Sequence, residues 1–294
     1  MSIQSLSIVV PGERCINRCP FCVSSSHRDI IYENRIKNAV KEFEYYPETF
    51  DPKGLEYVKA LRYARDLGCT TVMLTGECEP QQNMNFLRFF FRVVPENLFN
   101  NFEIQTTGRG LDAKKILELV NLGINTFSLS IASLDMIENG NIITDGAEFW
   151  SLKNLCRNIK DNGCLLRLSI NLSDCVTKKY TPEELFRVCR EEFDANQVTL
   201  RQLYKPTDMC PQSKWIEEHT DLNKDKEFFD YIKKNGIRLE TLPYGMVKYS
   251  VDRIGTIADD DCMAKNCNED IRYLILRPDS HLYTRWDDPA SIIF

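Results

Sequence analysis

The sequence predicts an α/β fold, a partial (β/α)6 barrel of parallel strands with a small C-terminal extension. Apolar, β-branched segments of strand length alternate with segments of helical periodicity as far as residue 203. Strands joined by helical crossovers form a parallel sheet with helices on one face. Polar and sulfur-containing residues follow several of these strands, at the C-terminal ends where such barrels place their functional sites.

The first three strands are expected from short apolar runs. Leu6 to Val10 is a buried strand that Pro11 and Gly12 terminate. Apolar residues at helical spacing then precede Gly68, which suits a helix end; they are Leu55, Val58, Leu61 and Ala64. The next elements are a strand over 70–74, a helix over 82–94 and a strand over 102–107.

The second half of the barrel shows clearer helix boundaries. Asp112 is a suitable N-cap for a helix that ends at Gly123. Thr181 and Glu184 form a capping box with Pro182 at the first helical position, which predicts a helix over 182–191. The remaining expected elements are strands over 125–131, 164–172 and 198–203 and a helix over 147–160.

A boundary is expected near residue 210. Pro206 and Pro211 interrupt the alternation over 204–222, and a helix over 223–235 and short strand-like pieces follow. We therefore expect a barrel core over 1–210 and an extension over 211–294 that covers the barrel mouth. The 294 residues suffice for such an arrangement.

The composition is that of an ordinary globular enzyme, with 43% hydrophobic and 27% charged residues. No apolar stretch approaches the roughly 20 residues of a membrane span, and no secretory signal begins the chain. The net charge of −6 argues against broad nucleic-acid binding. Twelve cysteines scattered through apolar segments indicate a reducing cytoplasm rather than a disulfide scaffold. Six are expected as small apolar fillers, Cys69, Cys156, Cys164, Cys175, Cys189 and Cys210.

Three further cysteines, Cys15, Cys19 and Cys22, are spaced C-x3-C-x2-C just after the first strand. Three thiolates from one short loop can hold three irons of a [4Fe–4S] cluster and leave the fourth open to a small ligand. A zinc site normally needs a fourth protein ligand, and only His27 lies nearby. These cysteines are the predicted metal ligands.

The segment from Cys15 to Cys22 resembles the cluster loop of the radical S-adenosylmethionine (SAM) superfamily, and aromatic Phe21 before the last cysteine matches as well. The resemblance implies one [4Fe–4S] cluster whose open iron chelates the amino and carboxylate groups of SAM. It also implies an external reductant such as flavodoxin or ferredoxin, and cleavage of SAM to methionine and a 5′-deoxyadenosyl radical.

The turn after the second strand, from Thr75 to Pro80, resembles the Gly-Gly-Glu-Pro-like turn of that superfamily, which receives the SAM amino group. The turn is best aligned on Glu79 and Pro80, and Gly76 before them would let the backbone approach the ligand closely. Glu77 and Cys78 occupy positions where small residues are usual, and Glu77 is also a candidate to face the ligand. The alternative is a loop with two solvated carboxylates.

Other strand ends supply further candidate SAM contacts. By resemblance, Gln105 and Thr106 line the SAM site, and Ser130 binds ribose or carboxylate. Arg167 would pair with the SAM carboxylate, since a guanidinium matches a carboxylate in a bidentate manner. The alternative for Arg167 is a structural ion pair with a carboxylate of the barrel. Leu203 is expected to contact adenine through its backbone.

The segment from Cys262 to Trp286 resembles the C-terminal region of the molybdenum-cofactor GTP cyclase family. That family uses three cysteines there for a second cluster, whereas Arg285 stands at the third position here. We therefore expect no second cluster, and Cys262 and Cys267 as free thiols, a zinc half-site or a substrate contact. Three arginines in this segment would suit an anionic substrate if they face the barrel, Arg272, Arg277 and Arg285.

These expectations describe a radical SAM enzyme that abstracts hydrogen from a small polar or nucleotide-like substrate. Because the chain starts at its first strand, without a preceding domain that could grip a leader peptide, a peptide or protein substrate is the second choice. Two alternatives of other classes are a non-catalytic iron–sulfur electron-transfer protein and a zinc-binding interaction module.

Overall fold

The computed structural model describes residues 3–12, 14–22, 52–76, 78–205, 210–242, 245–260, 271–286, 288 and 290–294. Within them a single 11-stranded sheet has the order β11-β10-β1-β2-β3-β4-β5-β6-β9-β8-β7. The six strands expected from the sequence form its centre, namely β1 (Ser5–Val10), β2 (Thr71–Gly76), β3 (Asn101–Thr106), β4 (Thr126–Ile131), β5 (Leu165–Leu172) and β6 (Gln197–Gln202). All their pairings are parallel, which confirms the predicted fold class.

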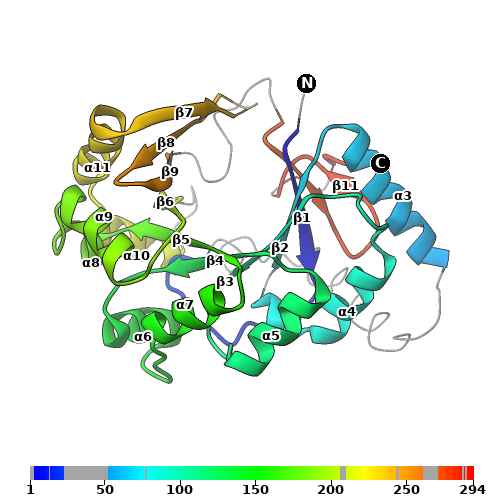
Figure 1. Cartoon of the computed structure of the whole chain (residues 1–294), viewed down its shortest axis with the longest axis horizontal. Coiled ribbons are helices and arrows are strands. Elements are labelled where there is room, and N and C mark those ends of the chain that lie inside the picture. Colours follow the sequence, from blue (N-terminus) through cyan, green and yellow to red (C-terminus); the bar gives the residue numbers. More distant parts are fainter. Residues whose placement is uncertain are drawn as a thin grey trace.

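The C-terminal part of the chain extends this sheet at both edges. β9 (Ile254–Asp259) pairs in parallel with β6, and β10 (Tyr273–Leu276) pairs in parallel with β1. Antiparallel strands complete the edges, β8 (Val247–Val251) and β7 (Ile237–Thr241) beside β9, and β11 (Leu282–Tyr283) beside β10. The sheet curves into an open arc with β7 to β9 on one side and β1 and β11 on the other (Figure 1).

Helices cover the outer side of this arc (Figure 1). Between β1 and β6 they are α3 (Pro52–Asp66), α4 (Met84–Val93), α5 (Ala113–Leu122), α6 (Met136–Thr144), α7 (Leu152–Asp161), α8 (Asp174–Thr177) and α9 (Pro182–Glu191), with the 3-10 turn η1 (Pro80–Gln82) after β2. Beyond β6 lie α10 (Pro211–His219) and α11 (Leu222–Asn235). None of the described helices has the length and hydropathy that crossing a membrane requires.

Capping residues set several helix boundaries. The predicted capping box is present, because Thr181 Oγ1 accepts from the Glu184 amide and the Glu184 side chain accepts from the Thr181 amide. Asp112 caps α5 by accepting from Lys115 at 2.7 Å. The helix expected from 147 begins only after Ser151, whose side chain caps α7. Pro211, expected to interrupt the alternation, is instead the first residue of α10.

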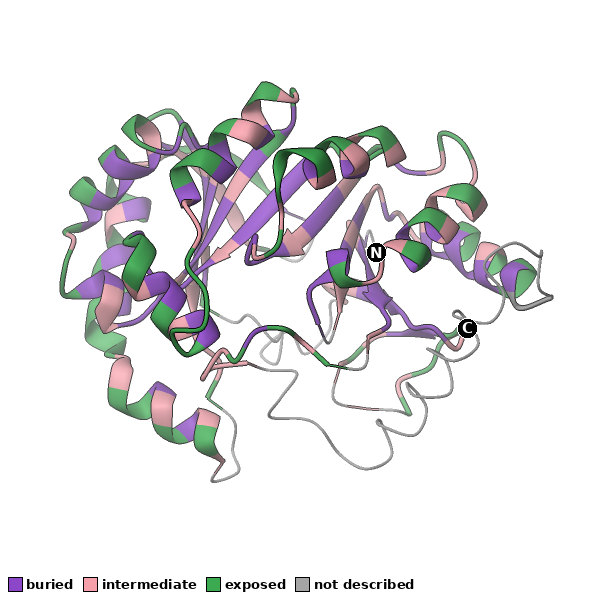
Figure 2. Ribbon diagram, turned by 90° about the horizontal axis from the view of Figure 1, so that it is seen from below, coloured by how far each residue is buried: buried purple, intermediate pink, exposed green. Residues whose placement is uncertain are grey.

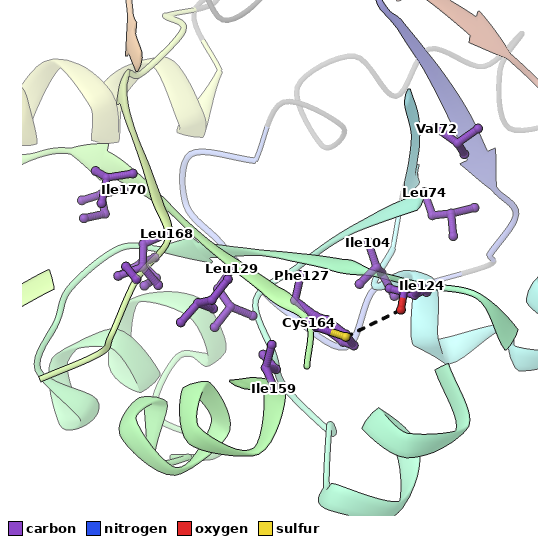
Figure 3. Close-up of a cluster of buried hydrophobic side chains, with 14 of the residues drawn as sticks. Val72, Leu74, Ile104, Ile124, Phe127, Leu129, Ile159, Cys164, Leu168 and Ile170 are labelled. Carbon is purple, nitrogen blue, oxygen red and sulfur yellow. Dashed lines mark hydrogen bonds between the residues drawn. The ribbon is translucent and has the colours of Figure 1, made fainter. Parts of the chain in front are cut away.

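The two faces of the sheet differ in polarity. Alternate strand residues pack beneath the helices and form the main apolar core, and Figure 3 shows part of it, including Val72, Leu74, Ile104, Phe127, Leu129 and Leu168. Cys69, Cys156, Cys164 and Cys189 lie in this core as expected, and the Cys164 thiol donates to the Ile124 carbonyl. Buried strands fill the centre in Figure 2, while exposed residues lie on the outer sides of the helices. The other strand face is largely polar and lines the inside of the arc.

Candidate functional site

The ends of β1, β2 and β3 bring the predicted cluster loop and two further loops together. β1 and β2 pair up to Val10 and Gly76, so the chain segments after them leave the sheet side by side. The cysteine loop follows β1, the Cys78–Pro80 turn follows β2, and Thr107 follows β3. The site therefore lies at the carboxyl ends of parallel strands, where the sequence placed it.

Cys15, Cys19 and Cys22 are free thiols within this loop. The Cys22 amide donates to the Cys19 carbonyl at 3.2 Å, and the Asn17 amide donates to Cys15 Sγ at 3.4 Å. Burial raises the pKa of Cys15 and, more strongly, that of Cys19, and the neighbouring Cys22 raises the pKa of both further. The thiols of Cys15 and Cys19 therefore ionise more readily when a bound cation compensates their charge.

This donor set fits an iron–sulfur cluster better than a single metal ion. No group of three or more His, Cys, Asp or Glu side chains among the described residues is arranged to hold one metal ion. Zinc needs its four ligands within about 2.0–2.3 Å of one centre, whereas a [4Fe–4S] cluster takes each thiolate on a different iron. Three cysteines on one loop, without a fourth protein ligand in the described part of the chain, are the donor set that such a cluster uses.

A buried carboxylate, Glu79, clamps the cysteine loop to the rest of the site. Asn17 Nδ2, from inside the loop, donates to Glu79 Oε1 at 2.7 Å and to Thr107 Oγ1 at 3.0 Å. Glu79 also accepts from the Thr107 amide, from Gln81 Nε2 at 2.8 Å and from the Thr106 hydroxyl. Only 5% of Glu79 is exposed, so protein donors occupy both carboxylate oxygens.

Burial raises the pKa of Glu79, and the hydrogen bonds from Thr106, Gln81 and Thr107 oppose that shift. These donors bond best to the ionised form, so their number offsets the cost of burying the charge. The predicted alternative of two solvated carboxylates is wrong for Glu79. Glu77 lies outside the described residues.

Side chains after β2 hold the loop at a second place. Gln82 Nε2 donates to the Arg14 carbonyl at 2.9 Å, and Gln82 Oε1 accepts from the Ile16 amide at 3.1 Å. Asn83 Nδ2 donates to the Pro11 carbonyl at 2.9 Å. Two amide side chains thus satisfy backbone groups that the irregular loop leaves unpaired.

Contacts from the segments after β3 and around the end of α6 complete the anchoring. The Arg109 guanidinium donates to the Ile16 carbonyl and is held by Glu148 at 2.8 Å. The Arg18 amide donates to the Ile143 carbonyl at the end of α6 at 2.7 Å. The sequence reasoning identified the cysteines but missed these anchors, because each is distant in the chain and of a common residue type.

Glycines allow the loops after β1 and β2 to pack closely. A Cβ at Gly12 would overlap Cys78 Sγ, and one at Gly76 would lie 2.5 Å from the Val10 carbonyl oxygen. Cys78 is buried. The position expected to carry a small residue thus carries a thiol, and the space comes from Gly12 on the neighbouring loop.

Arg167 lies on the inner face of the sheet beside a carboxylate. Its Nη1 is 2.6 Å from Glu103 Oε2, and its Nε and Nη2 donate to Gln197 Oε1 at 2.9 and 2.7 Å. Glu103 is 2% exposed and also accepts from Gln105 Nε2 at 3.1 Å. The structure thus contains the ion pair that the sequence reasoning raised as the alternative, and it uses three of the five guanidinium N–H groups for contacts among the described residues.

The other predicted SAM contacts are more dispersed. Ser130 faces Ser169 in the β4–β5 register, and Leu203 directly follows β6. Phe21 contacts Trp215 of α10, with 5.4 Å between ring centroids. The Thr106 hydroxyl donates a hydrogen bond to Glu79, as described above. Cys262 and Cys267 lie outside the described residues.

Comparison with known proteins gives consistent matches. The radical SAM superfamily model matches residues 9–172. Streptococcus suis SuiB bound to precursor peptide SuiA has TM-score 0.59 and 15% identity, covering 96% of this chain and 59% of that one. SuiB bound to S-adenosylmethionine has TM-score 0.58 and 14% identity, covering 97% of this chain and 60% of that one. Native anSMEcpe with bound AdoMet and Cp18Cys peptide has TM-score 0.59 and 13% identity, covering 97% and 74%.

At these identities the structural matches show a shared fold. The chain spans about three fifths of the length of SuiB. No curated protein sequence matches it. The family match ends at residue 172, so the resemblance of the C-terminal segment to GTP cyclases is not shown and stays a prediction.

Proposed function

Because the chain belongs to the radical SAM superfamily, we propose that it is an enzyme in which Cys15, Cys19 and Cys22 hold a [4Fe–4S] cluster. When bound, the cluster supplies the electron that cleaves SAM into methionine and a 5′-deoxyadenosyl radical, which abstracts hydrogen from the substrate. The observation that carries this function is the arrangement of three free thiols on one loop, anchored through Asn17 to Glu79.

The turn after β2 would receive the SAM ammonium group. Protein donors already occupy the Glu79 carboxylate, so backbone carbonyls of the turn from Gly76 to Glu79 are the better acceptors. Gly76 lets this turn start close against β1, where a Cβ would lie 2.5 Å from the Val10 carbonyl oxygen. Glu79 itself would act by holding the loop, and Cys78 by packing the turn against Gly12.

The remaining SAM contacts would come from inner-face residues and from the end of β6. Ser130 is proposed to bind ribose or carboxylate, and Arg167 to offer guanidinium N–H groups to the carboxylate. Gln105 would line the site beside Glu103, and Leu203 would meet adenine. Phe21, packed on Trp215, would shield the cluster from water.

A small polar or nucleotide-like molecule is the proposed substrate, since polar side chains line the inside of the arc. A peptide is the second candidate, because SuiB and anSMEcpe, which share the fold, are seen with bound peptides. An external reductant such as flavodoxin or ferredoxin would supply the electron, and a reducing cytoplasm would keep the thiols free.

The test is anaerobic reconstitution with iron and sulfide, followed by SAM and dithionite and quantification of 5′-deoxyadenosine. We expect product from the parent chain and none from the triple Cys15/Cys19/Cys22→Ala variant. Cys156→Ala is the matched control, since it removes a thiol from α7 in the helical layer. A loaded cluster without any SAM binding would favour the electron-transfer alternative, and zinc in place of iron and sulfide would favour the zinc module.

A further inference from the structure

A second group of charged residues lies inside the arc, far along the sheet from the cysteine loop. Arg201 of β6 and Asp259 of β9 are register neighbours near the carboxyl ends of their strands. Asp259 is 2% exposed, and its Oδ1 accepts from Arg272 Nη2 at 3.0 Å. Its Oδ2 is 3.8 Å from Arg201 Nη1. Two guanidinium groups therefore lie beside one buried carboxylate.

Strand alternation directs Arg201 to the inner face. Its neighbours Val198 and Leu200 belong to the apolar core beneath the helices, so Thr199 and Arg201 point the other way. Asn171 of β5 lies beside Arg201 in the register. These residues occupy the same end of the sheet as the cysteine loop, where a substrate would enter.

The Arg201 guanidinium makes few hydrogen bonds with the described residues. Its contact with Asp259 is beyond hydrogen-bond distance, and its Nε is buried without a hydrogen-bond partner among the described residues. Arg167, two strand positions from the start of β5, differs, since its three nitrogens lie within 2.9 Å of acceptors. Nε is enclosed by protein atoms, so a ligand would meet the exposed Nη groups, and Nη1 approaches Asp259 only to 3.8 Å.

SAM is an unsuitable ligand for these Nη groups. Its single carboxylate is already assigned to the open iron of the cluster and to Arg167 of β5. The adenosine part that would extend toward β6 carries no negative charge.

We propose that Arg201, held by Asp259 and flanked by Arg272, binds an oxyanion of the substrate, either a carboxylate or a phosphate. Its side chain is 31% exposed, so a ligand can reach it from inside the arc. A guanidinium suits such a group because its planar fork matches two oxygens. That the bound anion belongs to a substrate rests on the proposed function. The anion site itself can be tested without SAM.

The experiment measures binding of inorganic phosphate and of succinate to the reconstituted chain by calorimetry, at constant ionic strength set with chloride. We expect saturable binding of at least one of them, weakened by about tenfold or more in Arg201→Gln. Arg201→Lys, which keeps the charge but loses the fork, should give an intermediate loss. Arg190→Gln is the matched control, because Arg190 lies on α9 and pairs with Asp252 and Glu191.

The outcomes separate this inference from the proposed function. Binding of phosphate alone would indicate a phosphorylated substrate, and binding of succinate alone a carboxylate. Equal affinities in the parent chain and in a folded Arg201→Gln variant, or no binding of either anion to the parent, would overturn the inference. A parent chain that binds an anion through Arg201 but cleaves no SAM would overturn the proposed function instead.

Discussion

At the scale of single residues, the site divides into groups that the sequence reveals and groups that only the fold brings together. The three cysteines are recognisable because their chemistry requires a short, fixed spacing. Asn17, Gln82 and Arg109 carry no such signal, since their partners lie tens of residues away. Sequence reasoning can propose the cluster ligands, but not the side chains that hold their loop.

The Glu79 clamp gives the first prediction. Glu79→Ala removes one of the two acceptors of Asn17 Nδ2 and the acceptor of the Thr107 N–H, so the free energy of unfolding should fall by about 2–4 kcal/mol. The cluster should also be retained less well. Urea unfolding and iron content after desalting measure the two effects. Glu118→Ala, which removes a surface partner of Arg88, should change stability by less than about 1 kcal/mol; equal losses in both variants would refute the clamp.

Arg167 and Glu103 give the second prediction. Glu103 is buried, so Arg167→Gln leaves an uncompensated carboxylate and should destabilise the chain by about 3–5 kcal/mol. Adding Glu103→Gln should recover most of that loss, as a double-mutant cycle in urea would show. Additive effects would mean that the two side chains do not interact. SAM affinity measured on the stable double variant then tests whether Arg167 also binds the SAM carboxylate.

At the scale of elements, periodicity and caps placed the six central strands and the main helices within a few residues. α9 was predictable to the residue because Thr181, Pro182 and Glu184 encode its start. α6 was missed because Gly140 and several polar residues obscure its apolar face. The pairing of β9 with β6 and of β10 with β1 was also missed, because the sequence of a short strand does not indicate which strand it pairs with.

The contact between the loops after β1 and β2 gives the third prediction. Gly12→Ala would press a methyl group onto Cys78 Sγ and should cost about 1–3 kcal/mol. Cys78→Ala removes the sulfur, so the double variant should be more stable than the sum of the single changes predicts. Gly54→Ala is the matched control, because nothing lies within 4 Å of its added Cβ and it should be neutral or stabilising. Thermal unfolding compares all four, and a cost unaffected by Cys78→Ala would contradict the contact.

At the scale of the whole molecule, one sheet serves two functions. Its outer face buries apolar residues under the helices, while its inner face carries polar and charged groups from β3 to β9. Residues after 211 add strands to both edges rather than forming a separate sheet. The predicted division at residue 210, with an extension over the barrel mouth, stays a prediction, but the Arg272–Asp259 ion pair links the two edge regions.

The pH dependence of global stability gives the fourth prediction, through Asp225 in the first turn of α11. Asp225 is 1% exposed, and neither of its carboxylate oxygens has a hydrogen-bond partner among the described residues. Burial, assisted by the charge of Asp221, raises the pKa of Asp225 from 3.8 to about 7. At a pH between these two pKa values, Asp225 keeps its proton in the folded chain and releases it in the unfolded chain. The free energy of unfolding therefore falls as pH rises from about 4 to 7, and levels off above.

Asp225→Asn removes this titration while keeping the shape of the side chain. It should match the parent near pH 4 and be more stable at pH 8, by roughly 2–4 kcal/mol, because the parent then buries an unpaired charge. Urea unfolding at pH 4, 6 and 8 measures the difference between the two curves. Asp230→Asn is the control on the same helix, since Asp230 is exposed beside Lys226 and should leave the curve unchanged in shape. Parallel curves for parent and Asp225→Asn would show that the folded chain holds no extra proton at Asp225.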